Sequence, residues 1–241
     1  MDNLEAGAPG KFSTSTETVD LIVIGSGVAG MTTAIVAKIL GLHVTVLEKT
    51  EFIGGTTALS AGAAWLPGNH HVPKESDPRD PLTYVKQLIG GRMDADLVQS
   101  YLDHGTRCLD FLEKHTCVRF RMFEGADYRT SVEGASLVGR TVDPVPFDDR
   151  VLGDLQKMIR PPLPWMTIFH GLQTDNAGVH HLQNALRSPR SLLFSIKLLA
   201  KHYCDLVRFR RSTRRVRGSA LVGMLFKSAL DHDVKIRARA D

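Results

Sequence analysis

Two short, uninterrupted apolar runs stand near the start of the chain, at Leu21–Ile24 and His43–Leu47. Continuous runs rich in β-branched residues are typical of strands that are buried on both faces of a parallel sheet. The stretch between them predicts a helix over Met31–Leu40, and Gly41 follows in the position where glycine commonly ends a helix. Together these elements form one βαβ unit, the beginning of a Rossmann-like, doubly wound parallel sheet in an α/β protein.

Apolar residues at helical spacing recur further along the chain. They predict helices over residues 82–89, 96–114, 191–209 and 220–230, and short apolar runs predict strands over 117–123 and 234–238. In the helix over 96–114, the residues expected to reach the core are Leu97, Tyr101, Cys108, Phe111 and Leu112. The segment 128–164 is rich in glycine and proline, so it is expected to be irregular.

These elements divide the chain into a tail and one partial domain. Residues 1–18 are rich in small polar residues and are expected to form a disordered tail. Residues 19–241 are expected to form a domain in three parts: a βαβ core over 19–76, a helical and irregular excursion over 77–212, and a helix and strand over 213–241 that return to the sheet. The last predicted strand has the character of an internal strand, so the sheet is expected to be incomplete.

Composition favours an ordinary soluble protein, with 43% hydrophobic and 23% charged residues. The three cysteines share no metal-ligand spacing, and their odd number argues against a disulfide framework, so a cytoplasmic location is expected. The uncharged stretch Leu21–Ala37 is interrupted by glycines and is not preceded by a basic segment. It therefore indicates neither a signal peptide nor an integral membrane protein.

The formal net charge of +4 is concentrated in one place, because six arginines crowd into residues 208–217. Clustered arginines can neutralise nucleic-acid phosphates. No aromatic platform, zinc motif or recognition-helix pattern accompanies this cluster, so nucleic acid is not expected as a partner. A solvated face or a patch that meets an acidic partner is the preferred interpretation.

The residues Gly25–Gly30 carry the pattern Gly-x-Gly-x-x-Gly between the first predicted strand and the first helix. Gly25 permits a tight turn, Gly27 lets the backbone approach a pyrophosphate, and Gly30 lets the helix pack closely on the sheet. The N-terminus of the helix then offers free N–H groups to an anion. The motif stands where its mechanics require, so it predicts a dinucleotide site.

Glu48 ends the second predicted strand, where an acidic side chain can accept hydrogen bonds from both hydroxyls of an adenosine ribose and repel a 2′-phosphate. A second glycine-rich loop follows at Gly54–Gly62, with hydroxyls that can line the path of a longer cofactor. The two loops therefore favour FAD over NAD. The residues expected to bind it are Gly25, Ser26, Gly27, Val28, Ala29, Gly30, Glu48, Lys49, Gly54, Gly55, Thr56, Thr57, Ser60 and Gly62.

These loops, together with Trp65-Leu66-Pro67-Gly68-Asn69, resemble the FAD-binding domain of the fumarate reductase and succinate dehydrogenase flavoprotein superfamily. The Trp-x-Pro-x-Asn element is similar to the 3-ketosteroid Δ1-dehydrogenase branch. Stretches within 139–153 and 212–225 are similar to the same branch. The resemblance implies FAD as the cofactor, a glutathione-reductase-like type of sheet, and further parts that this chain does not contain, including a substrate-capping domain.

The resemblance also implies a function: an FAD-dependent oxidoreductase that dehydrogenates a 3-ketosteroid or similar ketone at the carbons next to the carbonyl. A steroid-like ketone is then the expected substrate, and the missing carboxy-terminal half or another polypeptide is an expected partner. The alternatives are a fumarate reductase-like flavoprotein acting on a dicarboxylate, and a truncated FAD-binding remnant without catalysis. The family's catalytic motifs do not occur here, so the catalytic residues stay unknown.

Four other features invite a chemical interpretation. Adjacent histidines occur at His70-His71 and His180-His181, but neighbouring side chains in a loop are expected to point different ways, so no metal site is predicted. Tyr128, in the irregular segment, is the tyrosine best placed to line a pocket. Trp165 stands among prolines and is expected to serve in packing.

Overall fold

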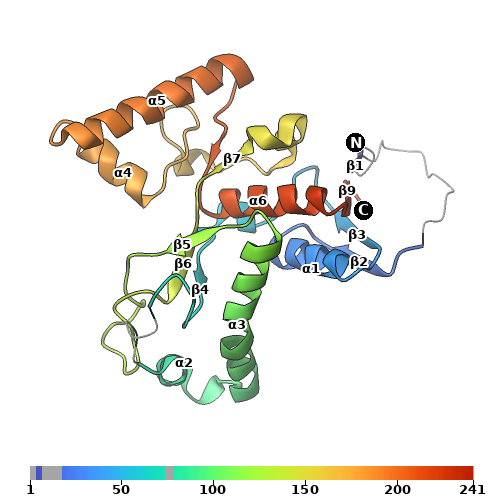
Figure 1. Ribbon diagram of the computed structural model, residues 1–241, viewed down its shortest axis with the longest axis vertical. Coiled ribbons are helices and arrows are strands. Elements are labelled where there is room, and N and C mark those ends of the chain that lie inside the picture. The colour runs from blue at the N-terminus through green and yellow to red at the C-terminus, as the bar shows by residue number, and fades with distance from the viewer. Residues whose placement is uncertain (1–3, 7–17, 74–76, 78, 241) are drawn as a thin grey trace. The chain divides into compact units, whose positions relative to one another are not determined.

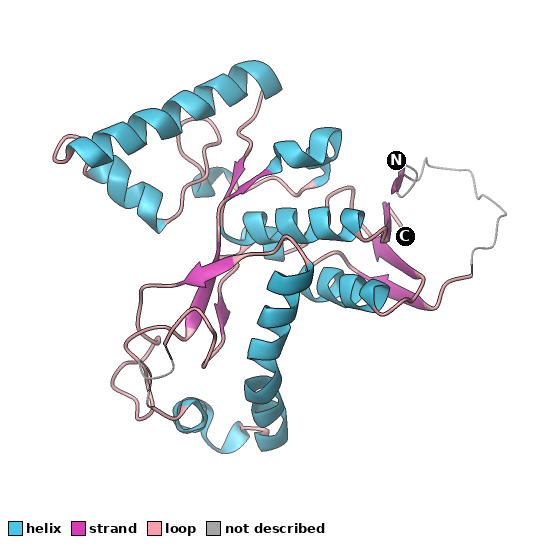
Figure 2. Cartoon of the chain, viewed as in Figure 1, coloured by secondary structure: helices cyan, strands magenta, loops and turns pink. Residues whose placement is uncertain are grey.

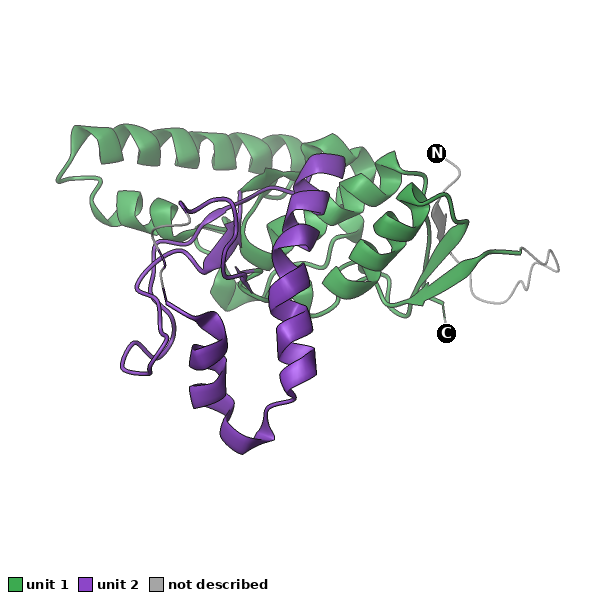
Figure 3. Cartoon of the chain, turned by 60° about the horizontal axis from the view of Figure 1, so that its bottom comes forward, with its two compact units in different colours: residues 1–62, 146–241 green, residues 63–145 purple. Residues whose placement is uncertain are grey.

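The computed structural model describes residues 4–6, 18–73, 77 and 79–240. They divide into two compact units (Figure 3). Unit 1 comprises residues 1–62 and 146–241, and unit 2 comprises residues 63–145. The expected excursion over 77–212 overlaps unit 2 only in part, since the chain re-enters unit 1 at residue 146.

Unit 1 is built on a parallel sheet of four strands (Figure 1). In spatial order they are β1 (Leu4–Ala6), β9 (Lys235–Ala238), β3 (Val44–Glu48) and β2 (Leu21–Ile24). The strands predicted over 21–24, 43–47 and 234–238 are confirmed to within one residue, and so is the α/β fold class. β3 therefore lies beside β2 and carries Glu48 to the same edge of the sheet as the glycine turn.

The structure differs from the expected disordered tail at one place. Residues 4–6 form β1, which pairs with β9 in parallel register from Leu4 with Ile236 to Ala6 with Ala238. The backbone of β9 offers an unpaired edge on that side, which a short extended segment can occupy. Residues 1–3 and 7–17 of the predicted tail lie outside the described residues.

Two helices of unit 1 pack together beside this sheet, α1 (Val28–Ile39) and α6 (Arg217–Asp231). α1 begins three residues earlier than predicted, because the last part of the glycine motif already has helical geometry. α6 is buried along most of its length, and Phe226 and Leu225 are fully buried. The core of unit 1 therefore lies around α1, α6 and β3.

The remaining elements of unit 1 lie between residues 146 and 215 (Figure 2). They are β7 (Phe147–Asp148), the 3₁₀ segments η4 (Asp149–Met158) and η5 (Pro164–Met166), the helices α4 (Asn176–Gln183) and α5 (Pro189–Phe209), and β8 (Arg214–Arg215). The segment 128–164 was expected to be irregular, yet part of it forms β7 and η4. The glycine content does not prevent these elements. Gly153 takes a positive φ of 56°, which glycine adopts readily, and η4 bends there.

Unit 2 combines a small antiparallel sheet with helices. The sheet has the order β4 (Ala64–Trp65), β6 (Thr141–Pro144) and β5 (Phe120–Met122), so the strand predicted over 117–123 is shorter than expected. The helical elements are α2 (Pro81–Ile89), η3 (Gly90–Arg92) and α3 (Ala95–His115). Asp80 and Asp94 begin the two α-helices by accepting hydrogen bonds from first-turn amides.

The face of α3 that reaches the core was predicted only in part, since Leu112 is buried as expected. Leu97, Tyr101 and Cys108 are exposed, whereas Leu109 and Leu112 are buried. Helical spacing is satisfied by either set, so the sequence pattern does not choose between them. Packing against Leu66 determines which face is buried, because a Cβ at Gly105, one turn before Leu109, would lie 2.8 Å from the Leu66 side chain.

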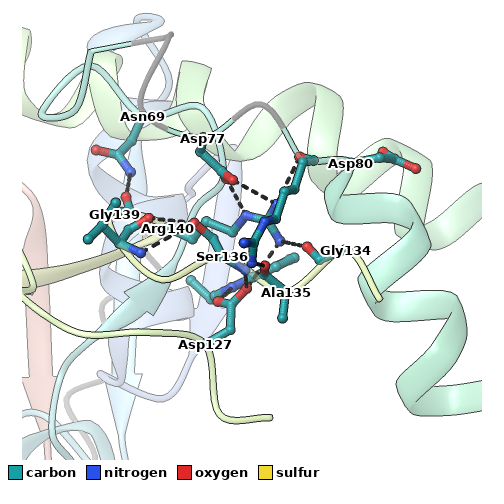
Figure 4. A network of polar contacts seen from close by, with 12 residues as sticks. Asn69, Asp77, Asp80, Asp127, Gly134, Ala135, Ser136, Gly139 and Arg140 are labelled. Atoms are coloured by element: carbon teal, nitrogen blue, oxygen red, sulfur yellow. Dashed lines mark hydrogen bonds and ion pairs between the residues drawn. The ribbon is translucent and has the colours of Figure 1, made fainter. Parts of the chain in front are cut away.

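A buried arginine organises the loops of unit 2 (Figure 4). Arg140 is 2% exposed, and its guanidinium donates to Asp127 at 3.1 Å, to the Gly134 carbonyl at 2.8 Å, and to both carboxylate oxygens of Asp77. Asp127 also accepts from the indole N–H of Trp65 at 2.7 Å. A buried charge is tolerated when it is paired and hydrogen-bonded in this way, so the network holds Asp77, Asp127 and Gly134 around Arg140.

Candidate functional site

The glycine turn joins β2 to α1 with the geometry that the motif predicts. Gly25 has a φ of +93°, a left-handed conformation that favours glycine, and its N–H donates to the Leu47 carbonyl at 2.7 Å. A Cβ at Gly30 would overlap the carbonyl oxygen of Gly25. Glycine is therefore required at position 25 by the backbone conformation and at position 30 by the protein's own packing.

Gly27 differs, because the protein does not require it to be glycine. Its φ is −68°, and the nearest protein atom to a Cβ placed there is the Thr57 hydroxyl at 3.6 Å. Gly27 is the N-cap of α1, whose first turn holds no acidic residue, and Val28 and Ala29 after it are exposed. A bare backbone at a helix N-terminus is a suitable cradle for a pyrophosphate, so this turn fits the dinucleotide group that the sequence predicts.

The second glycine-rich loop lies against the first. The N–H of Gly54 donates to the Ser26 hydroxyl at 3.0 Å, and the N–H of Val28 donates to the Thr57 hydroxyl at 3.0 Å. The structure thus brings together the two loops that the sequence predicted to share one cofactor. The exposed members of the second loop are Thr56, Ser60 and Ala61.

The first turn of helix α6 packs against this second loop, a contact that the sequence pattern alone did not reveal. A Cβ at Gly62 would lie 2.6 Å from the backbone N of Gly218, and a Cβ at Gly218 would lie 2.7 Å from the Ser60 hydroxyl. The N–H of Gly218 also donates to the Ser60 carbonyl at 3.1 Å. Backbone therefore meets backbone here, and Gly62 and Gly218 allow that approach.

Glu48 lies at the end of β3 as predicted, but its carboxylate already accepts hydrogen bonds from neighbouring residues of the protein. Ser26 donates to one oxygen from its N–H at 3.0 Å and its hydroxyl at 2.5 Å. Thr50 donates to the other oxygen from its N–H and its hydroxyl, each at 3.0 Å. A carboxylate has about four acceptor positions, so a ribose hydroxyl must displace the hydroxyl of Ser26 or Thr50.

These hydrogen bonds also set the ionisation of Glu48. Burial by itself would raise the pKa of this carboxyl, but the hydrogen bonds from the Ser26 hydroxyl and from the Thr50 and Ser26 amides outweigh burial and lower the pKa. Glu48 is therefore an anion at neutral pH. Lys49, the next predicted site residue, is exposed beside it.

The histidine pairs give a different outcome from the one expected. His70 and His71 do not point different ways, because both rings face Glu113, with N–O distances of 2.8 and 3.3 Å. Their potential ligand atoms lie within 4.8 Å of one another, and Asp110 faces the other ring nitrogen of His70 at 2.6 Å. The loop conformation decides this, which adjacency in the sequence does not specify.

The remaining candidates fall outside the cofactor loops. His181 contacts the Ser191 hydroxyl at 3.0 Å, which gives it a partner within unit 1. Tyr128 is fully exposed in unit 2, so the expectation that it lines a pocket is wrong for the described chain. Trp165, expected to serve in packing, is 79% exposed.

The arginine cluster is only partly a solvated face. Arg211 and Arg215 pair with Asp149 at 3.3 and 2.6 Å, and Arg214 pairs with Asp175 at 3.4 Å. Burial raises the pKa of the Asp149 carboxyl, although the charge of Arg215 opposes this. These arginines therefore hold η4 and the start of α4 within unit 1.

The chain matches the family model described as FAD binding domain over residues 20–241. It is 37% identical over 219 residues to the 4-oxocyclohex-2-ene-1-carboxylate 5-dehydrogenase of Sinomonas cyclohexanicum, a match that covers 90% of this chain and 37% of that protein. It is 34% identical over 212 residues to the 3-oxosteroid 1-dehydrogenase of Mycolicibacterium smegmatis, which covers 85% of this chain and 35% of that protein.

Among solved structures, the 3-ketosteroid Δ1-dehydrogenase of Sterolibacterium denitrificans, in complex with 1,4-androstadiene-3,17-dione, superposes with a TM-score of 0.81 and 29% identity. That match covers 93% of this chain and 41% of the other. The chain thus spans 35–41% of the length of these three relatives. Its two loops and its parallel sheet, together with these matches, show that the chain belongs to the FAD binding domain family and that its cofactor is FAD.

Proposed function

We propose that this chain is the FAD-binding part of an oxidoreductase that removes hydrogen from a ring bearing an oxo group, as in a 3-ketosteroid. The observation that carries the proposal is the meeting of the two glycine-rich loops at the N-terminus of α1. The substrate class is supported by the two curated relatives, because each printed name describes a dehydrogenase of a ring with an oxo group. A dicarboxylate, the alternative from the sequence, has no comparable support among these relatives.

The proposed roles of the site residues follow from their positions. The backbone of Gly27, Val28 and Ala29 faces the pyrophosphate, which the positive end of α1 stabilises. Glu48 orients the adenosine ribose once the hydroxyl of Ser26 or Thr50 turns aside. The second loop, from Gly54 to Gly62, lines the path toward the flavin.

When bound, FAD supplies the acceptor for a hydride from the substrate, and the protein supplies binding, orientation and electrostatics. The chain's part in this is to exclude water from the pyrophosphate by the contact between its two loops, and to hold an anionic Glu48 at a fixed place. The proton-handling residue is not assigned to any residue of this chain.

The test of the cofactor site uses Gly27→Ala. The protein leaves room for this methyl group and φ is already that of an ordinary residue, so the melting temperature without FAD is expected to stay unchanged. FAD retained after desalting is expected to fall at least about tenfold, since the methyl group occupies the pyrophosphate cradle. The matched control is Gly91→Ala, where a Cβ meets no atom within 4 Å and where no cofactor contact is proposed.

Two outcomes would count against the proposal at different levels. If the unaltered chain retains no FAD, or if Gly27→Ala retains as much, the assignment of the loops is wrong. If FAD is retained but neither a 3-ketosteroid nor a 4-oxocyclohexanecarboxylate reduces it under anaerobic conditions, while fumarate reoxidises the dithionite-reduced protein, the substrate class is wrong and the cofactor site stands.

A reducing, cytoplasmic location is part of the same proposal. The three cysteines, Cys108, Cys117 and Cys204, form no disulfide among the described residues, and Cys108 and Cys204 are exposed. Exposed thiols persist where glutathione and thioredoxin keep them reduced. Counting free thiols in protein purified from its native compartment, under alkylating conditions, tests this point.

A polypeptide partner is proposed at the edge of the sheet. β2 lies at one end of the strand order, and its Ile22 and Ile24 are 57% and 87% exposed. An exposed apolar edge strand is a template for pairing with another chain. Faster amide exchange in β2 than in β3 for the isolated chain, and protection of β2 in a complex purified from cells, would support this pairing.

A further inference from the structure

Helix α5 buries mostly polar side chains and exposes apolar ones, which is the reverse of the usual arrangement. Its buried residues are Ser191, Ser195, Leu198, His202 and Asp205. Its exposed apolar residues are Leu192, Leu193, Ile196, Tyr203 and Val207. A mostly polar face therefore packs on unit 1, and an apolar face points away from it.

Specific polar contacts fix this orientation. The ring of His202 contacts the Phe169 carbonyl at 2.6 Å, and the Ser195 hydroxyl donates to the His181 carbonyl at 3.2 Å. The carboxylate of Asp205 accepts from the Thr213 hydroxyl at 2.6 Å. Buried polar groups that are paired in this way hold one rotation of the helix, since turning α5 would leave them unpaired in an apolar contact.

The outward side chains form one continuous stripe. Leu192, Ile196, Tyr203 and Val207 follow each other at spacings of four, seven and four residues, which places them on one face of a helix. They are 42%, 54%, 48% and 87% exposed. An exposed apolar stripe of this length marks an interaction surface.

Cations border this stripe along one side. Arg190, Lys197 and Arg208 follow each other at spacings of seven and eleven residues, so they share the neighbouring face of α5. Lys201 lies on the same face, but it pairs with Asp148 and Asp205. Residues 176–212 contain seven lysines or arginines and one acidic residue, Asp205, which is buried. The α4–α5 hairpin therefore presents an apolar stripe with a strongly cationic border.

We propose that α5 is an interfacial helix that lies on an anionic lipid surface. Its apolar stripe would enter the boundary between headgroups and acyl chains, and its cations would meet the lipid phosphates. Trp165 is 79% exposed and Phe169 is 48% exposed in the segment that His202 ties to α5, and such aromatic side chains favour the membrane interface. The helix lies along the surface and does not cross it, because no helix among the described residues is long and apolar enough to span a membrane.

A second copy of the chain fits this surface less well. Pairing two stripes would bring two cationic borders together, and the hairpin offers no exposed carboxylate between residues 176 and 212 to balance them. A nucleic acid would use the cations but would leave the apolar stripe in water. The lipid surface is the occupant that uses both features.

The experiment is flotation of the full chain with vesicles of phosphatidylcholine alone or with phosphatidylglycerol added. Binding is expected only with phosphatidylglycerol, and it is expected to weaken at high salt. The double variant Ile196→Glu/Val207→Glu is expected to lower the fraction bound at least about tenfold, because it places two anions in the stripe. Lys197→Gln/Arg208→Gln, which leaves the stripe intact, is expected to weaken binding by a smaller factor.

The matched control is Leu137→Glu, at an apolar residue of unit 2 that is 57% exposed, close to the 54% of Ile196. It is expected to bind as the unaltered chain does, and circular dichroism confirms that each variant is folded. Equal flotation with neutral vesicles, no loss in the stripe variant, or an equal loss in Leu137→Glu would overturn the proposal. Concentration-dependent dimerisation that the stripe variant abolishes, without vesicle binding by the unaltered chain, would assign the stripe to self-association instead.

Discussion

Helices α6 and α5 both belong to unit 1, yet they use their apolar residues in opposite ways (Figure 1). In α6, eleven of 15 residues are buried, and in α5 only five of 21 are. α6 packs against α1 and the second glycine-rich loop, whereas α5 is held by polar contacts and exposes Leu192, Ile196 and Val207. The difference teaches that an apolar period identifies a helix but does not tell which side meets the protein.

The comparison predicts first that the two helices tolerate truncation very differently. Phe226→Ala in α6 removes a fully buried ring and is expected to lower the free energy of unfolding by about 3–5 kcal/mol. Val207→Ala in α5 removes a side chain that is 87% exposed and is expected to change it by less than about 0.5 kcal/mol. Urea denaturation followed by circular dichroism measures both, and similar losses would remove the basis of the comparison.

A second prediction concerns the contact between α6 and the cofactor loop. Gly218→Ala would place a methyl group 2.7 Å from the Ser60 hydroxyl and against the Thr57 carbonyl. The loop must shift, so we expect a loss of about 1–3 kcal/mol in the free energy of unfolding and weaker retention of FAD. Gly91→Ala, in open space, serves as control. Unchanged FAD retention in Gly218→Ala would show that α6 does not support the site.

A third prediction tests the polar attachment of α5. Asp205→Ala leaves the Thr213 hydroxyl without its acceptor at 2.6 Å and removes one of the two carboxylates that pair with Lys201. We expect a loss of about 1–2 kcal/mol, mostly seen as faster amide exchange in α5. Asp154→Ala, whose carboxylate is 93% exposed, is the control and is expected to be neutral. Exchange that speeds up equally in α6 would mean that the two helices open together.

The smallest expected effect is the pH dependence of the contact between β7 and α5. Burial would raise the pKa of Asp148, but hydrogen bonds from Arg150 and Lys201 outweigh it and lower the pKa to about 2. Because the folded pKa lies below the ordinary 3.8, Asp148 stabilises the fold above pH 3.8, and this contribution is lost as the pH falls through about 2.

The measurement is a carboxyl titration by nuclear magnetic resonance, with Lys201→Met as the variant. The pKa of Asp148 is expected to move upward in Lys201→Met, and Asp148→Asn is expected to remove part of the acid-induced loss of stability, below about 1 kcal/mol because the side chain is one-third exposed. A pKa near 3.8 in the unaltered chain would contradict the assigned hydrogen bonds.

The sequence by itself determined the βαβ unit and the positions of the two glycine-rich loops. These depend on local requirements: a buried strand needs an apolar run, and a left-handed turn at Gly25 or a close approach at Gly30 needs glycine. Such requirements act between residues that are near each other in the chain. The pattern therefore located β2, α1, β3 and Glu48 without knowledge of the rest.

Only the tertiary structure decided which side of each helix is buried, and what already occupies Glu48. Leu97 and Tyr101 satisfied helical spacing as well as Leu109 did, and Ser26 and Thr50 filled the carboxylate that ribose was expected to use. Both outcomes depend on neighbours that the fold brings together, such as Leu66 against α3 and Thr213 against α5. Apolar periodicity indicates that a helix has two different faces, and the elements that pack against the helix determine which face is buried.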